Sequence, residues 1–150
     1  MTRYRYRFFY RVEDEDSQAV TILGEGISAM GTARIDFGAI YGRETEVLRW
    51  NLEQHLHWNS DYRSPFISAY EDEDVAFDIA YGRKKKGKNR VSVTVIDVSR
   101  VYGEVEFREM RPLAKRLGIW IPEKAYNNSK HEWVFLHDIP DDAIVDVHDI

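Results

Sequence analysis

The chain has 150 residues, 43% of them hydrophobic and 13% aromatic, which is enough to bury a substantial core in one domain spanning residues 1–150. That composition excludes a disordered chain, and the absence of cysteine excludes disulfides, cysteine-ligated metals and thiol catalysis. A net charge of −5 argues against nucleic-acid binding over the whole surface.

No apolar run approaches the roughly 18 residues of a membrane-spanning helix, so the sequence predicts no membrane segment. The first residues alternate between arginine and aromatic side chains, unlike the apolar region of a signal peptide. We therefore expect a cytoplasmic protein, although a secreted protein after processing would have the same composition.

The predicted elements begin with a strand over residues 2–12, where arginines alternate strictly with aromatic side chains. The acidic stretch 13–18 then predicts a turn. The glycine-containing stretch 17–43 has weak periodicity and predicts an irregular loop.

Helical spacing of apolar residues predicts helices over 44–58 and 71–82, with a short strand between them at 65–70. The cationic run 83–90 predicts a solvated loop, which we expect to lie outside any cleft. The remaining predicted elements are a strand over 90–98, a short helix at 112–117, a turn at 126–129, and strands over 132–139 and 143–150. This order is typical of an α+β fold rather than a regular βαβ alternation.

Three polar residues interrupt these apolar strands. Arg11 lies within the first strand, Ser68 lies within the strand at 65–70, and Glu132 begins the strand at 132–139. A buried charge or hydroxyl is tolerated only when it is paired or hydrogen-bonded. Two interpretations remain open: the three side chains meet in one cleft, or each lies at a sheet edge and is hydrated.

Three stretches that hold these residues resemble, in the same order, the signature regions of ADP-ribosyltransferases of the Arg-Ser-Glu type, as in the cholera-toxin-like enzymes. The stretches are "FYRV" at 9–12, "SPFISAYEDEDVAFDIA" at 64–80 and "HEWVFLHDIPDDAIVDV" at 131–147. The pair "HLHW" and "SPFIS" is also similar to a family of uncharacterised fungal domains. The resemblance implies an ADP-ribosyltransferase-like split, mostly antiparallel sheet with flanking helices, and NAD as the substrate.

The resemblance also implies a role for each site residue. Arg11 would anchor NAD through its phosphate or ribose, as a bidentate donor suits. Ser68 would hold Glu132, whose carboxylate would stabilise the oxocarbenium ion as nicotinamide leaves. His55 would line the NAD cleft, with a place on the helix surface as the alternative. Tyr70 would stack on nicotinamide or pack in the core.

Lys130 departs from the family pattern, because enzymes that modify arginine have an acid or glutamine two residues before the glutamate. This departure favours transfer of ADP-ribose to water, or loss of activity, over transfer to an unknown protein acceptor. An inactive member of the fold would be a protein-interaction module, which is a second hypothesis. A nucleic-acid-binding module using residues 83–90 is a third, although that run lacks interleaved aromatic residues. His55 and His57 point to different sides of a helix, so we expect no metal site.

Overall fold

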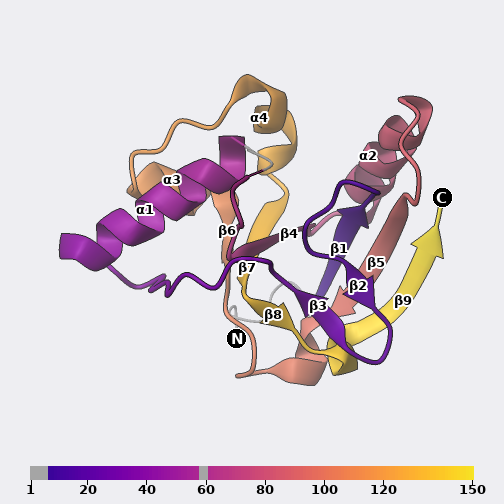
Figure 1. Cartoon of the computed structure of the whole chain (residues 1–150), viewed down its shortest axis with the longest axis horizontal. Helices are drawn as coiled ribbons and strands as arrows, with labels where there is room; N and C mark the ends of the chain where they lie inside the picture. The colour runs from indigo at the N-terminus through magenta and orange to yellow at the C-terminus, as the bar shows by residue number, and fades with distance from the viewer. Residues whose placement is uncertain (1–6, 58–60) are drawn as a thin grey trace.

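The computed structural model describes residues 7–57 and 61–150, and these residues form nine strands in two sheets (Figure 1). The strands are β1 (Phe8–Glu13), β2 (Thr21–Ile22), β3 (Gly26–Ser28), β4 (Phe66–Tyr70), β5 (Ser92–Asp97), β6 (Phe107–Glu109), β7 (Glu132–Leu136), β8 (Asp138–Ile139) and β9 (Ile144–Asp149). Six of them form an antiparallel sheet in the order β6-β7-β4-β1-β5-β9, and the other three form a small antiparallel sheet in the order β2-β3-β8.

The large sheet is weakly joined at its centre. Strand β1 pairs with β5 along its whole length, from Phe8 opposite Asp97 to Glu13 opposite Ser92. Its pairing with β4 has one register pair, Tyr10 opposite Tyr70. Because β1 and β4 share so little of the ladder, the backbone between them is not closed by regular hydrogen bonds. The candidate site lies at this junction.

The helices divide between the two halves of the sheet (Figure 1). They are α1 (Gly42–His57), α2 (Glu73–Lys85), α3 (Met110–Arg116) and α4 (Glu123–Ser129), with short 3-10 turns η2 (Val98–Val101) and η3 (Asp141–Ala143). Helices α1, α3 and α4 gather beside the β6–β7–β4 half, whereas α2 lies beside β1 and β5. Each helix therefore covers its own part of the sheet, and the junction of β1 and β4 lies between α1 and α2.

Three groups of buried apolar residues follow from this arrangement. The first joins α1 and α3 to strands β4 and β7, with Leu48 and Leu52 of α1 fully buried. The second lies between the large and the small sheet and centres on Phe9, which makes edge-to-face contacts with Phe135. The third joins α2 to β1 and β5 through Ala76 and its neighbours. Together these groups hold the two halves of the sheet in fixed relation.

The structure confirms the α+β fold and the mostly antiparallel sheet. The strand at 65–70, the helix at 44–58 and the strands at 90–98 and 143–150 agree with β4, α1, β5 and β9. The strand predicted over 2–12 agrees with β1 from residue 8 onward. Residues 2–6 of that strand and residue 58 of the helix at 44–58 lie outside the described residues.

Three predictions about local structure were wrong. The loop at 17–43 contains β2 and β3, which pair with each other, and β3 also pairs with β8 more than 100 residues away. The predicted turn at 126–129 is the end of helix α4. The predicted strand 132–139 is divided into β7 and β8 by His137, whose φ is 61°.

Helix α2 also continues three residues beyond its predicted end, to Lys85. Its first turn is capped by Asp72, whose carboxylate accepts a hydrogen bond from the Val75 amide at 3.1 Å. Lysine and arginine side chains in the last turn complement the helix dipole, so the cationic run extends the helix instead of ending it.

No helix in the described part of the chain is long and apolar enough to cross a membrane.

Candidate active site

Arg11 lies at the junction of β1 and β4 and is 7% exposed. Its Nη1 donates to the backbone carbonyl of Ser68 at 2.8 Å, and its Nη2 donates to the carbonyl of Ala19 at 2.6 Å. Its Nε forms an ion pair with Glu13 Oε2 at 3.0 Å. The guanidinium thus joins β1 to strand β4 and to the segment before β2. It replaces hydrogen bonds that the sheet ladder does not make between β1 and β4.

The Glu13 carboxylate is held from several sides. It also accepts from the amide of Thr21 at 2.9 Å and from the Thr21 hydroxyl at 2.7 Å. Glu13 lies two residues after Arg11, so both side chains leave the same face of β1. Burial lowers the pKa of Arg11, and the Glu13 carboxylate opposes that change. The pair is a buried, multiply bonded charge pair, which is costly to break.

Ser68 and Glu132 meet across the next pair of strands. In the ladder of β4 and β7, Glu132 lies opposite Tyr70 and Ser68 lies opposite Val134, so Ser68 and Glu132 are diagonal neighbours on one face. The Ser68 hydroxyl donates to Glu132 Oε2 at 2.7 Å. Ser68, which interrupts an apolar strand, and the buried carboxylate of Glu132 therefore satisfy each other's hydrogen bonding.

His55 adds a third element, helix α1, to this contact. Its Nε2 lies 2.7 Å from the Ser68 hydroxyl oxygen, and its Nδ1 lies 2.6 Å from the Ser64 hydroxyl oxygen. The Ser64 oxygen also accepts from the amide of Phe66 at 3.0 Å. The three side chains form a continuous chain of hydrogen bonds that ends on Glu132.

Counting protons assigns a direction to this chain. A serine hydroxyl has one proton, and the Ser68 proton goes to Glu132, so His55 Nε2 must carry a proton and donate it to Ser68. The Nδ1 of the neutral ring then accepts from Ser64. Burial, and then the positive charge of Arg11, lower the pKa of His55 to about 4, so this neutral form is the one present at pH 7. All donors in the chain point toward the Glu132 carboxylate.

Burial raises the pKa of Glu132, and the hydrogen bond from Ser68 partly opposes that rise. Burial also raises the pKa of Tyr70, and the neighbouring Glu132 raises it further. The site therefore places a carboxylate where negative charge is destabilised, which increases its interaction with any positive charge that develops nearby.

A cavity of about 340 Å³ opens beside these residues, a size within the range of small-molecule sites. Arg11, His55, Ser68 and Tyr70 all line it. Glu132 does not line it, since the residue is 7% exposed and its carboxylate lies behind the Ser68 hydroxyl that donates to it. The structure thus brings together all five residues singled out in the sequence, four on the cavity wall and one behind it. Tyr70 lines the cavity and also packs against the residues between α2 and β1, and its stacking on nicotinamide stays a prediction.

The segment that carries Ser64 is held in place by a close backbone approach. The Gly31 amide donates to the Ser64 carbonyl at 2.8 Å, and a Cβ at Gly31 would lie 2.1 Å from the Arg63 carbonyl oxygen. Only glycine fits there, so Gly31 helps to set the position of the serine that holds His55.

The expectation that the cationic run lies outside the cleft was wrong. Arg83 of α2 and Lys88 of the following turn both line the cavity. Residues 14–19, which we name the strap, pass across the same opening, with Asp14, Asp16, Ser17, Gln18 and Ala19 on the cavity wall. Most of the strap falls in the polar turn predicted at 13–18, for which the sequence predicted no role in binding.

Sequence reasoning missed Glu13, Ser64, Arg83 and Lys88. Glu13 carried a usable signal, because an acid two residues after a buried arginine shares its strand face. The acidic run at 13–16 and the cationic run also carried complementary charge, "EDED" against "RKKKGKNR". Ser64 carried no signal, since its role depends on where α1 places His55. Among residues 7–57 and 61–150, no group of three metal-ligating side chains comes together.

Comparison with known protein families places the chain in one of them. The model of a family described as DUF7587, a domain of unknown function, matches residues 4–150. The chain belongs to the DUF7587 family. No curated protein matches this DUF7587 domain.

Among solved structures, the domain is similar to a chain called EcPltA, with a TM-score of 0.58 and 18% sequence identity. The match covers 95% of this chain and 74% of EcPltA. At that identity the likeness concerns the fold alone, and it suggests an ADP-ribosyltransferase-like fold for this DUF7587 domain. The fungal part of the sequence resemblance is not tested by these comparisons and stays a prediction.

Proposed function

We propose that this protein cleaves the nicotinamide–ribose bond of NAD and transfers ADP-ribose to water or to a protein acceptor. The observation that carries the proposal is the convergence of Arg11, Ser68 and Glu132, joined by hydrogen bonds, beside a cavity in an ADP-ribosyltransferase-like fold. The sequence resemblance singles out the same three residues.

In the proposed reaction the bond between the ribose C1′ and the nicotinamide nitrogen breaks, and its electron pair leaves with neutral nicotinamide. The ribose ring becomes an oxocarbenium ion, and the Glu132 carboxylate stabilises that positive charge. Water then attacks C1′ and loses a proton, which gives ADP-ribose. Arg11 keeps two of its five N–H groups beyond the three bonds described above, which suit a phosphate or ribose oxygen.

Lys130 favours water as the acceptor. It lies at the end of α4 with its side chain exposed, at the position where enzymes that modify arginine have an acid or glutamine. A cation there cannot accept a proton from an attacking guanidinium group. Lys130→Glu would supply a carboxylate and is the natural variant for testing transfer to arginine.

One observation favours a second candidate, an inactive member of the fold that serves as a protein-interaction module. Glu132 is buried behind Ser68 and does not line the cavity, so ribose has to approach it from the Ser68 side. If no such approach exists in solution, the hydrogen-bonded chain from Ser64 to Glu132 is a structural device only.

Two measurements on the purified protein separate these candidates: a binding titration with NAD, and the release of nicotinamide. In an active enzyme, Glu132→Gln should lower nicotinamide release by about 10²-fold or more while NAD affinity falls much less, the scale of losing one preorganised electrostatic group. Glu123→Gln, an identical change at an exposed position in α4, is the matched control and should leave both unchanged. Folded wild-type protein that neither binds NAD nor releases nicotinamide would contradict the proposal.

A further inference from the structure

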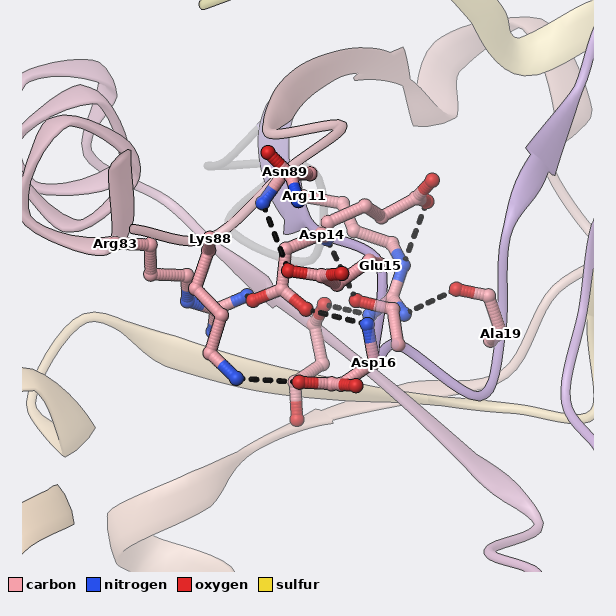
Figure 2. Close-up of polar contacts among 11 residues, drawn as sticks. Arg11, Asp14, Glu15, Asp16, Ala19, Arg83, Lys88 and Asn89 are labelled. Atoms are coloured by element: carbon pink, nitrogen blue, oxygen red, sulfur yellow. Dashed lines mark hydrogen bonds and ion pairs between the residues drawn. The ribbon is translucent and has the colours of Figure 1, made fainter. Parts of the chain in front are cut away.

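Two cations on the cavity wall are paired with carboxylates of the strap. Arg83 Nη1 donates to Asp14 Oδ2 at 3.2 Å, and the ammonium group of Lys88 forms an ion pair with Asp16. Figure 2 shows both contacts side by side, with the strap lying between Arg11 and the turn after α2. All four side chains line the cavity.

The strap is fixed at both ends by other contacts. At its acidic end the Glu15 amide donates to the Asn89 carbonyl at 3.0 Å, and the Asn89 amide donates to Glu15 Oε1 at 2.9 Å (Figure 2). At its other end the Ala19 carbonyl accepts from Arg11, and the Gln18 side chain accepts from the Ser64 amide. Asp14 and Asp16 are thus carried to the two cations by a segment that is held beside the opening.

These two cations differ from Arg11 in how their charge is used. Arg11 is buried and donates to a carboxylate and to two backbone carbonyls. The side chains of Arg83 and Lys88 are 34% and 42% exposed, and their charged partners in the cavity are the strap carboxylates. The Lys88–Asp16 pair is exposed on both sides and contributes little to stability, so another anion can replace Asp16 at little cost. The Asp14 side chain is 8% exposed, so replacing Asp14 beside Arg83 is the costlier of the two exchanges.

The anion that fits best is a pyrophosphate. It presents oxygens on two adjacent phosphorus atoms, so it can accept from two separate cations at once, as two carboxylates do here. Arg83 and Lys88 both belong to the short segment at the end of α2 and hold their partners on one side of the cavity. NAD carries a pyrophosphate between its two riboses, and the Ser68 end of the same cavity is where the proposed function places its nicotinamide ribose.

We propose that Arg83 and Lys88 form a phosphate subsite for the pyrophosphate of the dinucleotide, and that Asp14 and Asp16 occupy this subsite in the unliganded protein. The identity of the dinucleotide rests on the proposed function, whereas the preference of the subsite for pyrophosphate does not. Ligand binding exchanges the two strap carboxylates for phosphate oxygens, with no change in the buried bonds of Arg11.

The test is calorimetric titration of the full chain with inorganic pyrophosphate, ADP and NAD at low ionic strength. The Arg83→Gln/Lys88→Gln variant should bind ADP and pyrophosphate at least about tenfold more weakly, since charge-assisted hydrogen bonds are lost. The matched control is Lys84→Gln/Lys86→Gln, which removes the same net charge from exposed side chains that do not line the cavity and should bind like wild type. Asp16→Asn should raise affinity a few-fold, because the competing carboxylate loses its charge.

The outcomes distinguish this proposal from the proposed function. Pyrophosphate binding that depends on Arg83 and Lys88 supports the subsite even if NAD is never cleaved, in which case only the proposed function fails. Normal NAD binding and cleavage by the Arg83→Gln/Lys88→Gln variant overturns the subsite and leaves the proposed function standing. Equal losses in the control variant, or no binding of pyrophosphate and ADP by folded wild-type protein, also overturn the subsite.

Discussion

The cavity has two charged regions that are made of the same chemistry and differ in burial. On its floor, Arg11 pairs with Glu13 with both side chains at least nine-tenths buried, and the arginine also bonds to two backbone carbonyls. On its rim, Lys88 pairs with Asp16 with both side chains about half exposed. Both contacts are ion pairs, but they differ in how easily each charge can exchange its partner.

Burial decides the difference. On the floor, desolvation is the largest influence on Arg11 and lowers its pKa, so each hydrogen bond there replaces water that the group has lost. On the rim, water and salt screen the pair, and either partner can be hydrated again at little cost. The buried charges on the floor therefore keep one set of hydrogen bonds, whereas the exposed charges on the rim can exchange their partners. Arg11 keeps its carboxylate and carbonyl partners when a ligand binds, whereas Lys88 can exchange its carboxylate for a ligand.

The largest expected effect is on the floor. Arg11→Met removes the cation but leaves Glu13 buried and charged, so the free energy of unfolding should fall by about 3–5 kcal/mol. Lys88→Met, which removes a cation from the rim, should lower it far less, because Asp16 is half exposed and is hydrated again. Urea unfolding of both variants measures the two values. Equal losses would show that burial does not separate the two regions.

The second effect concerns pH and His55. Its folded-state pKa is about 4, below the ordinary value of 6.5, so the unfolded chain binds more protons than the folded protein between these values. Stability should therefore be retained above pH 6.5 and fall as the pH drops toward 4, by on the order of 1–2 kcal/mol between pH 7 and pH 5 for this partly buried side chain.

His55→Asn removes the titrating ring, so its unfolding free energy should change less over the same pH range than that of wild type. His57→Asn replaces an exposed histidine two residues away on α1 and is the matched control. It should follow the wild-type pH profile. A His55→Asn profile parallel to wild type would show that the chain from Ser64 to Glu132 does not hold the ring neutral.

The smallest effect belongs to the cationic run outside the cavity. Lys84, Lys85 and Lys86 are exposed, so their combined replacement by glutamine should change the free energy of unfolding by no more than about 0.5 kcal/mol. Thermal unfolding measures this directly. A larger loss would mean that the last turn of α2 depends on these charges and that the rim extends further along the helix. Tight, salt-sensitive binding of DNA or RNA that these changes abolish would instead favour a nucleic-acid-binding module.

The sequence by itself determined the elements whose pattern is local. The alternation at the start of the chain predicted β1, the helical spacing before residue 58 predicted α1, and the apolar run around Ser68 predicted β4. It also singled out Arg11, Ser68 and Glu132, because each polar group would be costly to bury without a partner. These inferences need only the properties of a residue and its neighbours in the chain.

Only the tertiary structure decided which partners those residues have. The Ser68 hydroxyl is shared by His55 and Glu132 because β7 pairs with β4 and α1 brings His55 to the same hydroxyl, and no local period predicts that placement. Strands β2 and β3 are too short for a sequence pattern to predict them, and β8 completes their three-stranded sheet by pairing with β3. The strap meets Arg83 and Lys88 about 70 residues away because β1 and α2 pack together. The periodicity of apolar residues predicts which side chains are buried, whereas strand register and helix packing determine which residues they contact.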